Sequence, residues 1–208
     1  MWFKALLDLI FPPRCEVCRQ QSEQALCAIC FNQIKFMKPG LGVYSVAVYD
    51  GVLKEALHRF KFKNRKNLAE PLGILLVKYL SHLPSFSWDE IDYLVPVPLH
   101  PRRERKRGFN QVELLAKVLS HYCGKSVARA LVRIRDTHPQ FDLPRSQRFA
   151  NVAGAFKVSD SRLVYQKGLL LLDDIYTTGA TMAECGKVLK AAGARSIKVL
   201  TLARAAEV

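Results

Sequence analysis

Four cysteines near the amino terminus have the spacing of a metal site. They form two Cys-x-x-Cys pairs, Cys15 with Cys18 and Cys27 with Cys30. Such pairs let four thiolates surround one tetrahedral Zn²⁺, so we expect a structural zinc site with no position left open for a substrate. Two disulfides or a redox-active dithiol are the alternatives, and the lack of an export signal disfavours both. The segment is too short to bury its own core, so zinc should supply much of its folding free energy.

A second chemical feature is an acidic pair followed by a threonine-rich turn, in the sequence GLLLLDDIYTTGAT at residues 168–181. Asp173 and Asp174 end an apolar strand, and the turn then contributes Thr177, Thr178, Gly179, Ala180 and Thr181. Hydroxyls, a glycine and the free amides of the next helix suit a phosphate, while two carboxylates suit the hydroxyls of a vicinal diol. The stretch predicts a sugar-phosphate site at the carboxyl end of a parallel strand. The alternative is a strand end, a turn and a helix cap without a ligand.

The third feature is clustered positive charge. The chain has 32 Lys and Arg against 18 Asp and Glu, a net charge of +14, and residues 54–66, 102–107 and 129–148 carry +5, +4 and +3 of it. Interleaved phenylalanines (60, 62, 109 and 149) make the pattern typical of single-stranded nucleic-acid binding. Taken singly, each ring is more typical of the core than of a binding surface, and 102–107 could serve a pyrophosphate alone. The candidate DNA-binding residues are Lys61, Lys63, Arg65, Lys66, Arg105, Lys106 and Arg107.

The elements that would position these residues alternate between strands and helices. Strand patterns occupy residues 43–49, 91–97, 127–134, 155–158, 169–172 and 196–203, and helical patterns occupy 52–62, 67–82, 112–122 and 181–192. Residues 135–151 have no sustained period. This order predicts an α/β fold with a parallel sheet covered by helices on both faces. We expect two parts: residues 1–40, with a short amphipathic helix ending at Pro12-Pro13 and the cysteine segment, and residues 41–208.

Several classes of protein are excluded at this level. No run approaches the ~18 apolar residues of a membrane span, so we do not expect an integral membrane protein. Neither a G-x-x-x-x-G-K-[ST] loop nor a G-x-G-x-x-G fingerprint occurs, which leaves an ATPase motor and a dinucleotide oxidoreductase unsupported. We expect the chain in the cytoplasm.

Two resemblances extend this interpretation. The string LLLLDDIYTTGAT resembles the phosphoribosyl pyrophosphate (PRPP) motif of type I phosphoribosyltransferases. The paired C-x-x-C motifs, then YDGVLKEALHRFKFKNRKNLA, then DYLVPVPLHPRRERKRGFNQVELLA, together with that motif, resemble the ComF family of bacterial competence proteins over nearly the whole chain.

The resemblance implies a phosphoribosyltransferase-type fold, a zinc-bearing amino-terminal segment and a role in DNA uptake during natural transformation, with possible partners in the competence machinery at the inner membrane. It also implies PRPP as ligand, with Mg²⁺ on its pyrophosphate. Asp173 and Asp174 match the ribose-binding acids, and residues 177–181 match the 5′-phosphate loop. By position, residues 135–151 match a mobile loop, and the turn at 98–103 matches a pyrophosphate loop containing Pro98, His100, Arg102 and Arg103.

Two functions therefore stay open. One is a PRPP-binding protein that handles single-stranded DNA. The other is a phosphoribosyltransferase of nucleotide metabolism that moves phosphoribose from PRPP to an unidentified base or amine. The sequence shows no base-recognition motif, and any hood over the site would come from residues 1 to about 90, so whether turnover occurs is left open.

Overall fold

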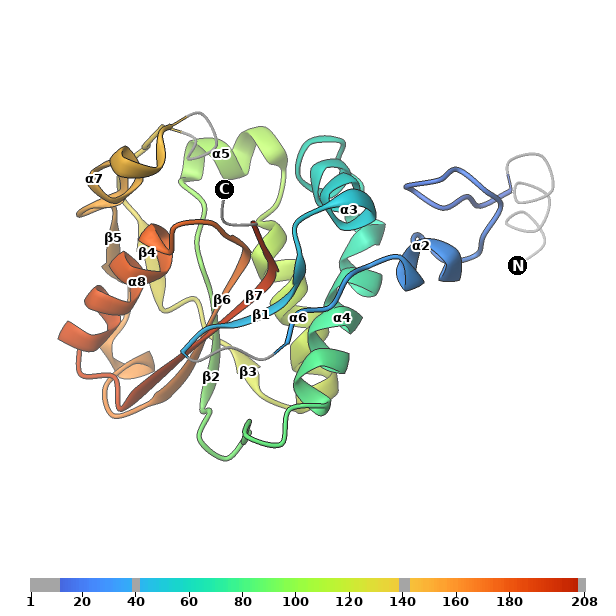
Figure 1. Cartoon of the computed structure of the whole chain (residues 1–208). Helices are drawn as coiled ribbons and strands as arrows, with labels where there is room; N and C mark the ends of the chain where they lie inside the picture. The colour runs from blue at the N-terminus through green and yellow to red at the C-terminus, as the bar shows by residue number, and fades with distance from the viewer. Residues whose placement is uncertain (1–11, 39–41, 139–142, 206–208) are drawn as a thin grey trace, which may run out of the picture.

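The computed structural model describes residues 12–38, 42–138 and 143–205. Its centre is a sheet of five parallel strands in the order β1-β7-β6-β2-β3 (Figure 1). These strands are β1 (Tyr44–Val48), β2 (Tyr93–Pro96), β3 (Ser126–Val127), β6 (Gly168–Tyr176) and β7 (Ser196–Arg204). The predicted α/β class, with a parallel sheet flanked by helices, is confirmed.

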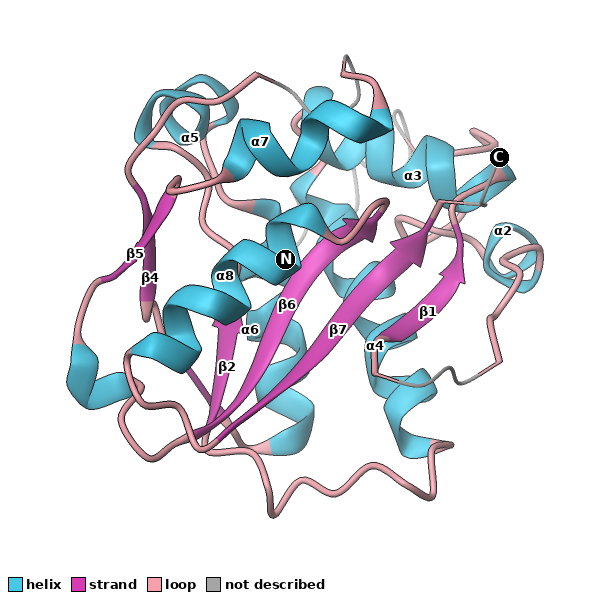
Figure 2. Ribbon diagram, turned by 60° about the vertical axis from the view of Figure 1, so that its left-hand side comes forward, coloured by secondary structure: helices cyan, strands magenta, loops and turns pink. Residues whose placement is uncertain are grey.

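Helices cover both faces of this sheet because consecutive residues of its central strands are apolar and point to its two faces in turn. Leu170 and Leu172 of β6 pack with α3 (Gly51–Phe62), α4 (Ala69–Ser81) and α6 (Gln111–Cys123), and the 3₁₀ turn η1 (Lys66–Leu68) precedes α4. Leu169 and Leu171 point the other way, toward α8 (Ala180–Ala191). Figure 2 shows α8 in front of the sheet, α4 and α6 behind it, and α3 at the edge where the strands end. The functional loops of a parallel sheet lie at that edge.

The segment 127–134 departs from its predicted single strand. Its first part is the two-residue edge strand β3, and after Ala128 the chain leaves the sheet. Its second part is β4 (Leu131–Arg133), which pairs antiparallel with β5 (Phe156–Val158) in a separate ribbon. The division follows from burial, because Leu131 and Arg133 turn into the core under α8 while Val132 stays exposed.

Three further stretches that the sequence left as turns or loops contain short helices. They are α5 (Pro101–Arg107), η3 (Arg145–Gln147) followed by α7 (Arg148–Val152), and η4 (Ser161–Leu163). The predicted turn at 98–103 becomes helical at Pro101, because proline fits the first helical position and the His100 ring accepts from the Arg102 N–H at 3.4 Å.

The cysteine segment packs directly against this domain. It contains the short helix α2 (Ala28–Asn32), and Leu26 and Ile34 join the core shared by α3 and α4. Phe36 forms an antiparallel bridge with Ala47 of β1. The predicted amino-terminal helix lies outside the described residues. Within residues 12–38, 42–138 and 143–205, the structure contains no helix with the length and apolarity needed to cross a membrane.

Candidate functional site

The acidic pair lies inside β6, and its two side chains face opposite sides of the sheet. The Asp174 carboxylate is 5% exposed and is already engaged: Lys61 Nζ of α3 lies 2.7 Å from Oδ1, and Gln111 Nε2 of α6 donates to Oδ2 at 2.5 Å. The two acids are therefore not equivalent, because Asp174 ties two helices to the sheet.

Asp173 is the carboxylate with spare capacity for a ligand. Its Oδ1 accepts from the Asp174 backbone N–H at 2.8 Å. Burial raises the pKa of Asp173 to about 7, and the charge of Asp174 adds to the rise, whereas Lys61 and Arg133 oppose it. A carboxyl poised near neutrality can lose its proton when a cation or a hydroxyl ligand arrives.

The threonine loop that follows β6 has the form of an anion cradle. Gly179 has φ +79°, and a Cβ at this position would lie 2.4 Å from the Tyr176 hydroxyl, so only glycine fits. Thr178 Oγ1 is buried and has no hydrogen-bond partner among the residues that the structure describes. The twelve-residue helix α8 begins directly afterwards and presents its amides and dipole to the loop.

The loop after β2 neighbours this cradle, because β2 and β6 are adjacent in the sheet. Arg103 Nε lies 3.3 Å from Asp136 Oδ1, and His100 Nδ1 lies 3.8 Å from Asp136 Oδ2. Arg103 also donates to the Thr137 carbonyl. Asp136 and Thr137, which follow β4, thus contact the predicted pyrophosphate loop directly. The side chain of Arg102, in the same loop, is exposed.

Arg133 of β4 is a residue that the sequence analysis did not single out. It is only 9% exposed, yet no carboxylate pairs with it in the described ranges. Its Nη2 donates to the Thr137 hydroxyl, its guanidinium lies 5.2 Å from the Phe156 ring centroid, and its Nε has no partner among described residues. Burial lowers the pKa of Arg133 and the charge of Arg103 lowers it further, whereas the charges of Asp173 and Asp136 oppose the shift only in part. A buried cation that no carboxylate contacts directly is suited to an incoming anion.

A cleft of about 220 Å³ opens beside Arg133 and Arg129. It is lined by Pro98 of the loop after β2, Glu104 of α5, and Arg133 with its neighbours on β4. The cleft connects the loop after β2 with the β4–β5 ribbon, so a ligand at the loop would have Arg133 within its wall.

The residues predicted to bind DNA fall into two groups. Lys61 points into the acidic site, and Arg65 pairs with Glu16 of the cysteine segment at 3.4 Å. The others lie toward the surface, where Arg107 is half-buried and the remaining four are exposed: Lys63, Lys66, Arg105 and Lys106. Of the interleaved rings, Phe60 and Phe109 are core residues, while Phe62 and Phe149 are 55% and 52% exposed.

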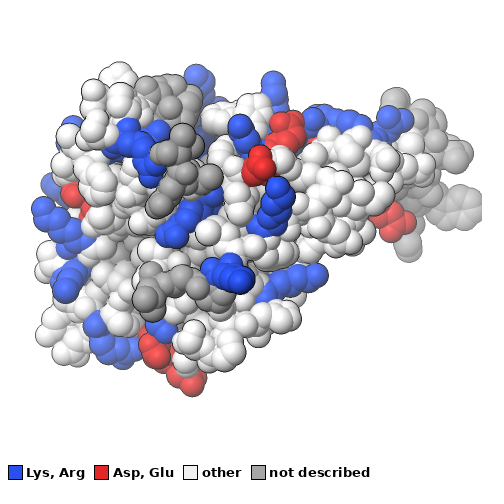
Figure 3. Space-filling model, in the orientation of Figure 1, with Lys and Arg blue, Asp and Glu red and all other residues white. Residues whose placement is uncertain are grey.

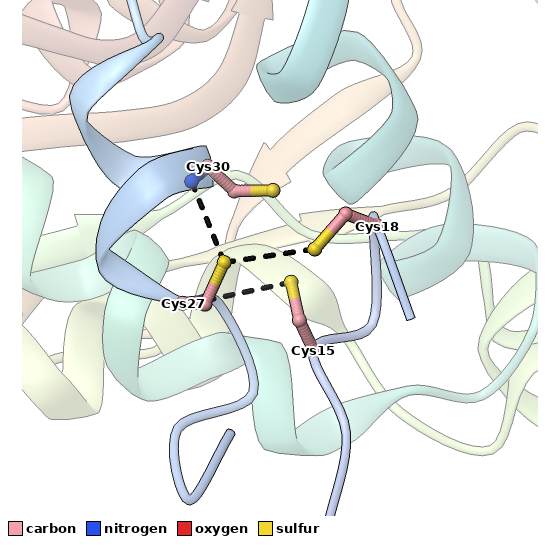
Figure 4. Close-up of side chains that lie close together, drawn as sticks. All are labelled: Cys15, Cys18, Cys27 and Cys30. Carbon is pink, nitrogen blue, oxygen red and sulfur yellow. Dashed lines mark hydrogen bonds between the residues drawn. The ribbon is translucent and has the colours of Figure 1, made fainter. Parts of the chain in front are cut away.

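The four cysteines converge as their spacing predicted (Figure 4). Their sulfurs all lie within 4.8 Å of one another, and Cys18 Sγ is 3.6 Å from Cys27 Sγ, close to the ~3.8 Å edge of a tetrahedral zinc–thiolate site. Cys15 Sγ accepts from the backbone N–H of Val17 and of Cys27, each at 3.4 Å. Burial works to raise the pKa of Cys15, but these bonds outweigh it and lower that pKa to about 6. The donor set fits a structural Zn²⁺.

Glu16 fixes this cluster to the rest of the chain. Its carboxylate is 8% exposed and accepts from Asn67 at 3.0 Å, and it pairs with Arg65 at 3.4 Å and Arg19 at 3.3 Å. Arg59 of α3 donates to the Glu16 carbonyl. The residue next to a metal ligand thus anchors the corner between α3 and η1.

Comparison with known families gives two matches that divide the chain. Residues 6–41 match the double zinc ribbon domain, and residues 105–207 match the phosphoribosyl transferase domain.

Curated proteins give matches over most of the chain. DNA utilization protein YhgH of Salmonella typhimurium is 33% identical over 177 residues, covering 84% of this chain and 77% of that protein. Competence protein ComFC of Streptococcus pneumoniae is 32% identical and competence protein F of Haemophilus influenzae 28%. These two matches cover 91% and 92% of this chain, and 81% and 90% of the relatives.

Among solved structures, glutamine PRPP amidotransferase from B. subtilis aligns with a TM-score of 0.48 and 18% identity. The alignment covers 71% of this chain and 30% of that longer one.

Proposed function

The chain belongs to the ComF family, in which a zinc ribbon is joined to a phosphoribosyltransferase domain, and on this premise we propose that it binds PRPP and single-stranded DNA in DNA uptake or utilisation. Two names motivate the DNA role, since relatives are called a DNA utilization protein and competence proteins.

The observation that supports PRPP most strongly is the combination of an anion cradle, a free carboxylate and buried positive charge at one edge of the sheet. The loop of Thr178 and Gly179 would hold the 5′-phosphate, and Asp173 would accept from the ribose hydroxyls. Arg103 and Arg133 would face the pyrophosphate. Mg²⁺ prefers oxygen ligands and would neutralise the pyrophosphate, with Asp173 as an oxygen donor nearby.

Calorimetric titration with PRPP and Mg²⁺ tests this binding. The wild-type protein should bind, and Asp173→Asn and Thr178→Val should each weaken binding about tenfold or more, since each removes a hydrogen bond to a charged or polar ligand group. Asp160→Asn is the matched control, because Asp160 pairs with Arg162 before η4. Wild-type protein that fails to bind PRPP, or a control as weak as the two site variants, would sink the proposal.

Exposed cations support the DNA part. Lys63, Arg105 and Lys106 are exposed at the ends of α3 and α5, and Lys66 is exposed at the start of η1. No acidic partner contacts these four within the described ranges. Clustered free cations neutralise the phosphates of a polyanion. Affinity for a labelled oligonucleotide should fall with salt, by a log–log slope of about −0.7 for each phosphate contacted.

Charge reversal locates that surface. Lys63→Glu and Lys106→Glu should weaken oligonucleotide binding and flatten the salt slope, whereas Lys187→Glu on α8, on the opposite face of the sheet, should not. Equal losses in all three variants would mean that only net charge matters and that no defined surface exists.

Transfer of phosphoribose to an acceptor is the second candidate, and the cations around the pyrophosphate loop favour it, since leaving pyrophosphate would need stabilisation. Pyrophosphate release from PRPP across a panel of bases, amines and oligonucleotides tests turnover. Release that depends on one acceptor and disappears in Asp173→Asn would establish it. PRPP binding without release would leave a binding protein.

A further inference from the structure

Two helices meet end to end beside an exposed aromatic ring. Helix α3 ends at Phe62 and helix α5 ends at Arg107, whose guanidinium lies 5.4 Å from the Phe62 ring centroid. The His58 ring, one turn earlier on α3, lies 5.3 Å from the same ring. Despite these contacts the Phe62 ring is 55% exposed. We propose that Phe62, backed by Arg107, is a stacking platform for a base of single-stranded nucleic acid, an inference that rests on the DNA binding proposed above.

The surroundings of the platform favour a polyanion over other occupants. Exposed cations lie near it along the chain: Lys63 follows Phe62, Arg105 and Lys106 precede Arg107, and Lys66 begins η1. Figure 3 shows many Lys and Arg side chains and fewer Asp and Glu on the face drawn there, with several of the Lys and Arg along the upper edge. An apolar protein partner would have to bury these cations without counter-ions, at high cost. A single strand supplies phosphates for the cations and flat bases for the ring.

The ring is held in place by the acidic site. Arg107 Nη1 donates to Gln111 Oε1, and Gln111 in turn donates to Asp174 Oδ2 at 2.5 Å. On the other side, Lys61 precedes Phe62 and lies 2.7 Å from Asp174 Oδ1. Arg107, through Gln111, and Lys61, the neighbour of Phe62 in the chain, are therefore both connected by hydrogen bonds to the buried carboxylate of Asp174.

This closed set of contacts has two consequences. A ring fixed before binding loses little conformational freedom when a base stacks on it. A strand stacked on Phe62 also lies on the two helix ends that Asp174 holds, so nucleic acid and the sugar-phosphate site share a support.

Phe62→Ala and Phe149→Ala form a matched pair for the test, because both remove a ring that is about half exposed. With fluorescein-labelled oligo(dT) in polarisation titrations, Phe62→Ala should weaken binding about tenfold, in the range expected for one stacked base, and Phe149→Ala should not. The salt slope should be unchanged in Phe62→Ala, because no phosphate contact is lost.

Arg107→Lys gives an independent readout, since it keeps the charge and removes the planar guanidinium. It should weaken binding without changing the salt slope. Abasic strands should bind wild type and Phe62→Ala equally. If Phe62→Ala and Arg107→Lys both bind oligo(dT) like wild type, the platform is refuted while DNA binding stands; if wild type binds no oligo(dT) at low salt, both proposals fall.

Discussion

Replacing Arg133 with Met should make the protein more stable and its ligand binding weaker. The guanidinium is 9% exposed, and no carboxylate among the described residues is in direct contact with it. Asp173 and Asp136 attract it, yet burial still lowers its pKa, so desolvation of the charge costs the folded protein free energy. Methionine keeps an apolar stem of similar length in the same place. The same substitution removes the cation that would face a pyrophosphate.

The contacts of Arg133 set the expected size of each effect. Its hydrogen bond to Thr137 contributes about 1 kcal/mol, and its stacking on Phe156 contributes about 1–2 kcal/mol. Burial of an unpaired charge costs several kcal/mol, which exceeds both. We expect Arg133→Met to gain about 1–2 kcal/mol, a Tm rise of roughly 2–8 °C. Loss of bonds to a charged pyrophosphate, about 1.5–3 kcal/mol, should weaken PRPP binding roughly 10- to 150-fold.

Differential scanning calorimetry and titration calorimetry measure the two effects on the same zinc-loaded samples. Ribose 5-phosphate, which lacks the pyrophosphate, should bind wild type and Arg133→Met equally. Arg162→Met is the control, because Arg162 is exposed, pairs with Asp160 at 2.8 Å and does not line the cleft. A less stable Arg133→Met protein that binds PRPP normally would refute the reasoning.

Three further predictions concern other parts of the site. Because burial raises the pKa of Asp173 to about 7, its ionised form is lost as pH falls through 7; Mg²⁺-PRPP affinity should therefore drop below pH 7, by up to about tenfold per pH unit, and Asp173→Asn should remove this part of the slope in calorimetric titrations. Gly179→Ala should lower Tm and abolish PRPP binding, whereas Gly186→Ala in α8, where a Cβ meets nothing within 4 Å, should raise stability by about 0.5–1 kcal/mol. Glu16→Gln should cost about 1–3 kcal/mol in thermal unfolding, and the exposed Glu23→Gln less than about 0.5. Asp173→Asn with an unchanged slope, equal Tm values for the two glycine variants, or a neutral Glu16→Gln would each contradict the corresponding argument.

Most of the correct predictions came from patterns of residues that lie close together in the sequence. The Cys-x-x-Cys pairs needed only local turns to converge, and the apolar run at 169–172 required a strand buried on both faces. The prediction of a single strand at 127–134 was wrong for a reason that lies in the tertiary structure. Only two residues pair at the edge of the main sheet, and Leu131, which is buried under α8, belongs to the separate β4–β5 ribbon.

The placement of Lys61 shows that a cluster of charges in the sequence does not tell which of its members lie at the surface. As one of six cations in residues 54–66 it was assigned to a surface, but it follows Leu53 and Leu57 at intervals of four. These two leucines are buried, so Lys61 shares the inward face of α3 at the helix end that reaches the sheet edge. That spacing could have predicted an inward lysine, although not its partner, because Asp174 is 113 residues away and only the packing of α3 against β6 brings them together. One position later, Phe62 is turned outward, so the same helix end serves the acidic site with one residue and the surface with the next.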